Sequence, residues 1–174
     1  VADARHPLEF TLAKSLRPDR IALVARVGDE ERATPLTILA GEAATDSNLN
    51  SIRLSLPEHQ AGELTLEWRY RGVIDDPPRE PRHLRFVTPS ETSGHIGPEG
   101  VYLSSESQWY PDLDGSLSTF HVVARVPLDW TVVTQGRQVD TRIDGTQRIA
   151  AWTVPTRSEA LTLVANIFAT KSRE

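Results

Sequence analysis

The chain contains neither cysteine nor methionine. The lack of cysteine excludes disulfides, thiolate catalysis and cysteine-ligated zinc, and it fits the cytoplasm and an exported location equally well. From the lack of methionine we expect that Val1 is not the natural start of translation. The chain is therefore either a processed product or an excised piece of something longer, and we favour the second. The opening residues VADARHPLEF also lack the basic and apolar regions of a secretory leader.

Positive charge and long apolar runs are also scarce. The 174 residues include 19 basic and 24 acidic side chains, and Lys14 and Lys171 are the only lysines, which we attribute to genome composition. This balance argues against nucleic acid or an anionic membrane surface as the main partner. No apolar run approaches the roughly 20 residues of a membrane-spanning helix. We therefore expect no nucleic acid and no membrane contact by this chain.

Helical periodicity is missing as well, whereas the alternation typical of strands is frequent. No segment of ten residues or more repeats with the helical period. The clearest strand in the first half is Glu63 to Val73, in which Leu64, Leu66, Trp68 and Tyr70 face one way. Other strands are predicted at 6–13, 21–27, 34–40, 52–56, 84–87, 120–126, 130–135, 148–154 and 161–169. Turn signals lie at Arg17–Asp19, Gly28–Glu31, Gly136 and Asp144–Thr146.

About nine or ten short strands with turns between them predict an all-β fold, an antiparallel saddle-shaped β-sandwich. We expect a single β domain over residues 1–174, strand-rich over 6–74 and again over 101–170. Between these parts, residues 75–100 are rich in proline, glycine and charge and predict a long irregular crossing. Such a crossing is either functional or mobile, or it is an ordered loop packed on the sheet.

The stretch from Gly100 to Phe120 concentrates aromatic residues that are rare elsewhere in the chain. Trp109 and Tyr110 are either a sugar-stacking or peptide-contact platform, or core anchors where the crossing rejoins the sheet. Asp112 and Asp114, with the following glycine, match half of a calcium loop, and an Asx turn is the better interpretation.

A complete set of catalytic residues is not found. The five histidines form no H-E-x-x-H motif and no i, i+2 pair, so no metal site is predicted and surface histidines are expected. Ser104, Ser105 and Ser107 lack a nucleophile elbow and are expected to hydrogen-bond their own loop. Gly94, Gly97 and Gly100 do not form a phosphate loop.

The order of features after Gly100 resembles a known family. An aromatic-Pro-x-x-Asp turn precedes a strand that begins Thr-Phe, and a Val-Pro-x-x-Trp stretch, a strand ending Trp-Thr-Val-Pro and an apolar strand follow. This resembles the N-terminal domain of zinc aminopeptidases of the aminopeptidase N type, the gluzincins that include leukotriene hydrolase. The match covers Gly100 to Ala169, with Gly115 where the family has an acidic residue. The positions that fall on the family pattern are Pro111, Asp114, Phe120, Pro127, Gly136 and Pro155.

The resemblance implies a saddle-shaped β-sandwich that is itself non-catalytic. Zinc would be held in a downstream thermolysin-like domain, the expected partner, and the substrate would be a peptide. In that family the β domain lends a Gln or Glu before the aromatic-Pro turn to the free amine of the substrate. By position Glu106 is the nearest candidate, with Gln108 behind it and Trp109 and Tyr110 beside them. For Glu106, a solvated loop glutamate is the alternative.

Two other functions stay open. The chain could be a stand-alone β-sandwich binding module for carbohydrate or protein, which exposed Trp109, Tyr110 and Trp130 on one face would favour. It could also be a structural module of an exported bacterial protein without a ligand.

Overall fold

The computed structural model describes residues 7–27, 30–39, 49–56, 64–76, 92–113 and 115–169. Within these ranges, regular structure consists of β-strands and one short 3-10 helix, η1 (Ser105–Ser107), and every strand pair is antiparallel. The prediction of an all-β, antiparallel fold is confirmed. No helix in the described part of the chain is long and apolar enough to cross a membrane.

Backbone contacts divide the chain into two compact units. Unit 1 comprises Val1–Val73 and Gln108–Asp114, and unit 2 comprises Ile74–Ser107 and Gly115–Glu174. The first boundary falls where the predicted strand-rich region gives way to the crossing. The second places the middle of the aromatic-rich stretch, Gln108–Asp114, with the N-terminal strands. A short segment from the second half of the sequence therefore completes unit 1.

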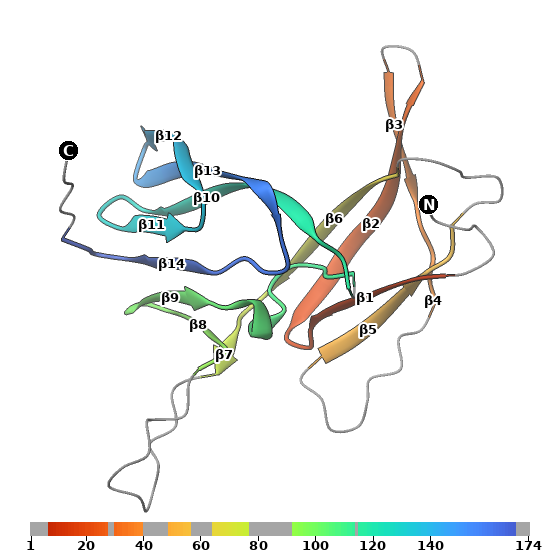
Figure 1. The fold of residues 1–174 in the computed structure, drawn as a ribbon, viewed down its shortest axis with the longest axis horizontal. Helices are drawn as coiled ribbons and strands as arrows, with labels where there is room; N and C mark the ends of the chain where they lie inside the picture. The colour runs from red at the N-terminus through yellow and green to blue at the C-terminus, as the bar shows by residue number, and fades with distance from the viewer. Residues whose placement is uncertain are drawn as a thin grey trace, which may run out of the picture. The chain divides into compact units, whose positions relative to one another are not determined.

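Unit 1 contains two three-stranded sheets (Figure 1), in the orders β1-β5-β4 and β3-β2-β6. Its core is aliphatic, with Leu12 and Leu54 fully buried, because alternate residues of each strand turn inward. The rings of Phe10 and Trp68 meet edge to face at 5.1 Å. The strands are β1 (Leu8–Ala13), β2 (Leu16–Val27), β3 (Glu30–Pro35), β4 (Ile38–Leu39), β5 (Leu49–Leu54) and β6 (Thr65–Gly72).

Unit 2 contains a five-stranded sheet, β11-β14-β9-β8-β7, and a three-stranded sheet, β10-β13-β12. Its core is formed by buried aliphatic residues of both sheets, such as Val132, Ile149 and Ala165, and by Leu161 just before the last strand. The strands are β7 (Asp75–Asp76), β8 (Gly94–Gly97), β9 (Gly100–Leu103), β10 (Ser118–Pro127), β11 (Thr131–Thr134), β12 (Arg137–Asp144), β13 (Gln147–Ser158) and β14 (Leu163–Asn166).

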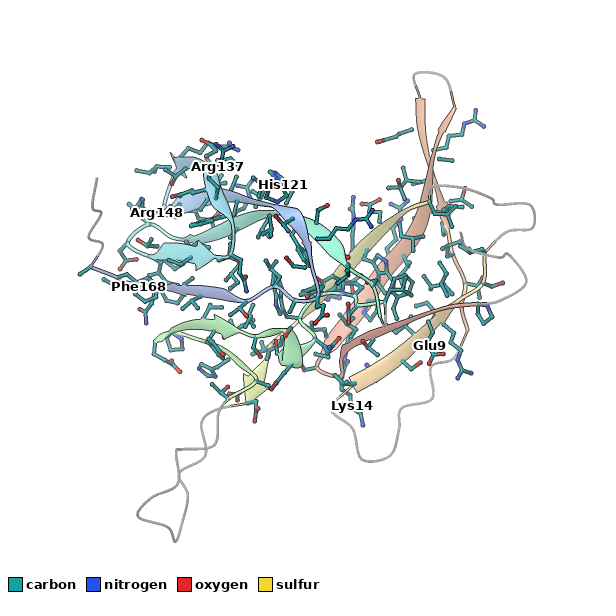
Figure 2. All side chains as sticks on the ribbon, in the orientation of Figure 1. Glu9, Lys14, His121, Arg137, Arg148 and Phe168 are labelled. Atoms are coloured by element: carbon teal, nitrogen blue, oxygen red, sulfur yellow. The ribbon has the colours of Figure 1, made fainter. Side chains whose placement is uncertain are left out.

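Alternation located the strands with one buried face well. In β10, half-buried and exposed side chains alternate from Ser118 to Arg125. His121 lies on the exposed side of this strand, as expected for a surface histidine (Figure 2). Such a strand packs one face on the core and leaves the other in solvent, so that its period of two is visible in the sequence. The strand predicted from Glu63 to Val73 is likewise present as β6.

The turn predicted at Arg17–Asp19 is wrong, because these residues lie inside β2. Proline has no N–H to give to a neighbouring strand, so it is tolerated where one edge of a strand is unpaired. β3 pairs with β2 only from Ala22 onward, and the register between β2 and β6 shifts between Pro18 and Arg20. Pro18 therefore occupies a one-sided, bulged part of the strand, and the actual turn lies at Lys14 and Ser15.

Several predicted boundaries also differ. The strand predicted at 34–40 divides into the end of β3 and the separate β4, which belong to different sheets. The stretch 130–135 forms β11, which leaves the sheet of β10 and pairs with β14. β12 was not predicted. The crossing 75–100 is not wholly irregular, since it contributes β7 and β8, and the strand predicted at 84–87 lies outside the described residues.

Candidate functional site

The segment from Gln108 to Asp112 lies along the edge of β1 that faces away from β5. The backbone N–H groups of Thr11 and Ala13 donate to the carbonyls of Asp112 and Gln108, both at 2.9 Å, and Asp112 donates back to Thr11 at 3.0 Å. Thr11 and Asp112 form an antiparallel bridge. The segment therefore covers an edge of β1 that would otherwise present unpaired backbone groups.

Gln108 begins this segment in an unusual backbone conformation. Its φ of 48° makes it the one non-glycine residue with positive φ in the described part of the chain. A left-handed conformation at a residue with a Cβ costs roughly 1–2 kcal/mol, so surrounding contacts must hold it in place. Hydrogen bonds hold both the backbone and the side chain of Gln108. Its carbonyl accepts from the N–H of Ala13, and its Oε1 accepts from Thr11 Oγ1 at 2.8 Å.

Trp109 and Tyr110 are both half-buried, and their rings meet edge to face with centroids 5.0 Å apart. The Tyr70 hydroxyl donates to the Trp109 carbonyl at 3.1 Å, and burial raises the pKa of the Tyr70 phenol. The two aromatic residues are therefore neither fully buried core anchors nor a freely exposed platform. The structure brings them together with Gln108 in unit 1.

Glu106, in contrast, belongs to unit 2, where it is exposed in η1. Two of the nearby serines, Ser104 and Ser107, make structural hydrogen bonds. Ser107 is buried and its hydroxyl donates to the Ser104 carbonyl at 2.7 Å, as the prediction of local bonding required. The Ser104 hydroxyl instead donates to Ser93 at 2.6 Å, beyond its own loop. Asp114 lies outside the described residues.

A second arrangement, not predicted as a site, lies on the outward face of the five-stranded sheet in unit 2. Register pairs Asp75 with His95, His95 with Tyr102, and Tyr102 with Val164, so these side chains form one row across four strands. The residues between them, such as Ala165, face the core. The row therefore presents one polar end and one apolar end on the same exposed face.

His95 is the centre of the polar end. Its Nδ1 lies 3.0 Å from Asp75 Oδ1, and its Nε2 contacts Glu99 Oε1. An imidazole donates from both nitrogens only when it is protonated. The hydrogen bonds to Glu99 and then to Asp75 accordingly raise the pKa of His95 above its usual value. The pKa of Glu99 is lowered by a bond from its own backbone N–H and by His95.

Glycine makes room for this group at two positions. A Cβ at Gly97 would lie 2.4 Å from His95 Nε2 and 2.7 Å from Glu99 Oε2. A Cβ at Gly100 would lie 2.8 Å from Asn166 Nδ2, which donates to the Glu99 carbonyl at 2.7 Å. The glycines of the β8–β9 hairpin thus allow these side chains to approach the backbone closely.

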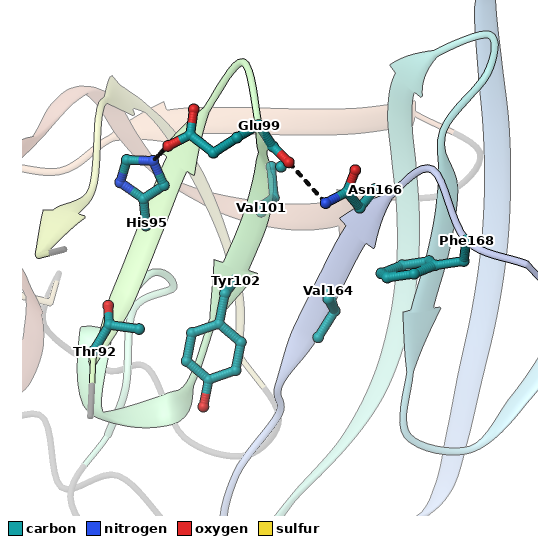
Figure 3. A pocket seen from close by; sticks show the side chains of 9 residues that line it. Thr92, His95, Glu99, Val101, Tyr102, Val164, Asn166 and Phe168 are labelled. Atoms are coloured by element: carbon teal, nitrogen blue, oxygen red, sulfur yellow. Dashed lines mark hydrogen bonds and ion pairs between the residues drawn. The ribbon is translucent and has the colours of Figure 1, made fainter. Parts of the chain in front are cut away.

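Beside this group the face is hollowed by a cavity of about 340 Å³. Figure 3 shows His95 and Glu99 at one end of the lining and the rings of Tyr102 and Phe168 on either side of Val164. The sequence contained one usable signal, since Gly97-Pro98-Glu99-Gly100 is a hairpin turn that sets His95 and Glu99 four residues apart. The partner Asp75 comes from twenty residues earlier and could not be anticipated.

Comparison with known proteins gives a match in fold but not in sequence. No family model and no curated relative matches the sequence. Among solved structures, an M1 zinc metallopeptidase from Deinococcus radiodurans matches with a TM-score of 0.62 and 18% identity over 93% of this chain. A two-domain M1 zinc metallopeptidase variant bound to L-tryptophan gives 0.62 and 16% identity. A variant of the Deinococcus enzyme bound to a Tyr-Ser-Ala substrate gives 0.60 and 18% identity.

These likenesses are in the fold alone, because the identities are low. The chain spans 35% of the length of each of these metallopeptidases. The family to which the matched proteins belong is the one that the Gly100–Ala169 stretch resembles. This chain therefore has the fold of one part of the M1 zinc metallopeptidases.

Proposed function

We propose that this chain is the non-catalytic N-terminal β domain of a metallopeptidase of the aminopeptidase N type. The observation that carries the proposal is the fold likeness over 93% of the chain to proteins of which it spans only 35%. The remainder of such a protein would hold the catalytic domain, and one matched structure is of a two-domain enzyme. In this proposal the β domain packs on that catalytic domain and lines its peptide-binding cleft.

Zinc would be held by the partner domain and not by this chain. Among the residues that the structure describes, no group of three or more His, Asp or Glu side chains could hold a metal ion. His95 does not provide such a site, because its two nitrogens face two different carboxylates. In this proposal the zinc chemistry belongs to the partner domain. The proposed part of this chain's residues is to position a peptide.

Glu106 is the proposed contact for the free amine of the substrate, with Gln108, Trp109 and Tyr110 as further contacts. Its exposure supports this role, because a solvent-accessible carboxylate can pair with a cationic amine and so orient the peptide. The proposed role of Gln108 is supported by its backbone, which hydrogen bonds hold at a positive φ, because strained conformations cluster at functional sites.

The test begins with the coding sequence that follows residue 174, in which an H-E-x-x-H motif and a later glutamate are expected. The full-length protein should then hydrolyse aminoacyl 4-nitroanilides with zinc, and the 174-residue chain alone should not. Glu106→Gln in the full-length protein should raise KM more than it lowers kcat, whereas Glu159→Gln, an exposed control, should change neither. Absence of the zinc motif would remove the peptidase half of the proposal.

The alternative is a stand-alone binding module for carbohydrate or protein. Exposed Trp109, Tyr110 and Trp130 on one face would favour this function, but all three are half-buried. Trp130 belongs to unit 2 and the other two to unit 1, so the three do not gather within either unit. The outward cavity of unit 2 is the feature that now favours a binding role.

A further inference from the structure

The cavity on the outward face of the five-stranded sheet has the composition of a small-molecule site. Such sites are largely apolar, with a few polar groups at fixed positions, and begin at about 300 Å³. Here the cavity has a volume of about 340 Å³. Tyr102 and Phe168, which are 38% and 39% exposed, contribute two accessible rings to its lining. Val164 extends the apolar surface between them (Figure 3).

The polar end carries a net negative charge. Two carboxylates, of Asp75 and Glu99, flank one imidazolium, so the group sums to a single negative charge while His95 is protonated. Glu99 lines the cavity, and its side chain is 65% exposed. It therefore pairs with His95 and still offers accessible carboxylate surface to a ligand.

The position of this carboxylate is fixed by its surroundings. Glu99 is held through its side chain by His95 and through its carbonyl by Asn166 on β14. A group held from two strands loses little conformational freedom when a ligand binds, which favours affinity. The Tyr102 and Phe168 rings in the same lining attract cations through their π faces, and repel anions for the same reason.

From this geometry we propose that the cavity binds a small organic amine, with its ammonium group at Glu99 and its apolar body across Tyr102, Val164 and Phe168. Charge complementarity selects a cation over an anion. The volume suits a free molecule of about one ring with a short chain. The proposed amine site needs neither zinc nor a partner domain, because every residue in it belongs to this chain.

The test uses the 174-residue chain, with 2-phenylethylamine as the probe and binding followed by amide chemical shifts. Two matched probes separate the contributions: 2-phenylethanol keeps the ring without the charge, and phenylacetate reverses the charge. The amine is expected to bind about tenfold more tightly than the alcohol, with no measurable binding of the anion. Shift changes should concentrate on β8, β9 and β14.

Variants then locate the two halves of the site. Glu99→Gln should reduce amine affinity to that of the alcohol, Phe168→Ala should weaken both probes alike, and Glu159→Gln should change neither. Thermal melting of each variant verifies that it is folded. Equal binding of amine and alcohol to the wild-type chain, or shifts confined to other strands, would overturn the proposal without reference to any variant. Neither result would bear on the peptidase test, which depends on the partner domain.

Discussion

In each unit, hydrogen bonds hold a segment without regular structure against a neighbouring strand, but the kind of hydrogen bond differs. In unit 1, the segment from Gln108 to Asp112 is bound to β1 by main-chain hydrogen bonds and one neutral side-chain bond. In unit 2, the β8–β9 turn is bound by an imidazole between two carboxylates and by an amide. The first arrangement depends on backbone geometry, whereas the second depends on protonation. The units should therefore respond differently to substitution and to pH.

The largest loss of stability is expected from changes in the aliphatic core that each unit has. Leu12 on β1 is fully buried and Leu161 before β14 is 1% exposed. Leu12→Ala and Leu161→Ala should each lower the free energy of unfolding by about 2–5 kcal/mol, because each removes buried methyl groups and leaves a cavity. Urea denaturation measures this loss. A loss below about 1 kcal/mol at either site would show that its core is loosely packed.

A smaller loss of stability is expected when Gln108, which hydrogen-bonds to β1, is replaced. Gln108→Ala keeps the strained backbone and removes the bond to Thr11 Oγ1, so it should destabilise the chain by about 1 kcal/mol. Gln108→Gly removes the same bond but relieves the positive φ, so the two terms should nearly cancel. Urea denaturation of both variants makes the comparison. Equal losses would mean that the backbone of residue 108 stores no strain.

Whether a strand could be predicted from the sequence depends on whether it has a buried face. β10 was found because its half-buried residues alternate with exposed ones, and a pattern of period two survives in the letters. β12 was missed because all eight of its residues are exposed, so it carries no buried face to mark it. Its only strand partner in the described residues is β13. That pairing is a main-chain property, which side-chain patterns do not encode.

The candidate sites show the same limit. The hydrogen bond of Ser107 to its own loop was predictable, because its partner lies three residues away. His95 was assigned to the surface, yet its side chain is only 24% exposed, because Asp75 and the hairpin turn enclose it. Those partners meet through strand register, and a single sequence does not contain the register. Local chemistry was therefore predictable, and chemistry assembled across strands was not.

The smallest and most selective effect is the pH dependence of the hydrogen bonds that His95 makes with Asp75 and Glu99 in unit 2. The pKa of His95 is raised above 6.5, so its contribution to stability is complete below pH 6.5 and is lost as pH rises through the raised pKa. The pKa of Glu99 is lowered below 4.5, so its contribution is complete above pH 4.5 and is lost as pH falls through the lowered pKa. The group should therefore stabilise unit 2 most between pH 4.5 and 6.5.

NMR titration of the His95 ring measures its pKa directly. Glu99→Gln should lower this pKa more than Asp75→Asn does, because the hydrogen bond to Glu99 raises it more than the hydrogen bond to Asp75. High salt should weaken both effects, because the carboxylates are exposed and salt screens exposed pairs. His95→Gln should remove the alkaline limb of the stability profile, and Glu159→Gln should leave it unchanged. The unit 1 bonds of Gln108 involve no titrating group, so an alkaline limb that persists in His95→Gln would contradict the contrast between the units.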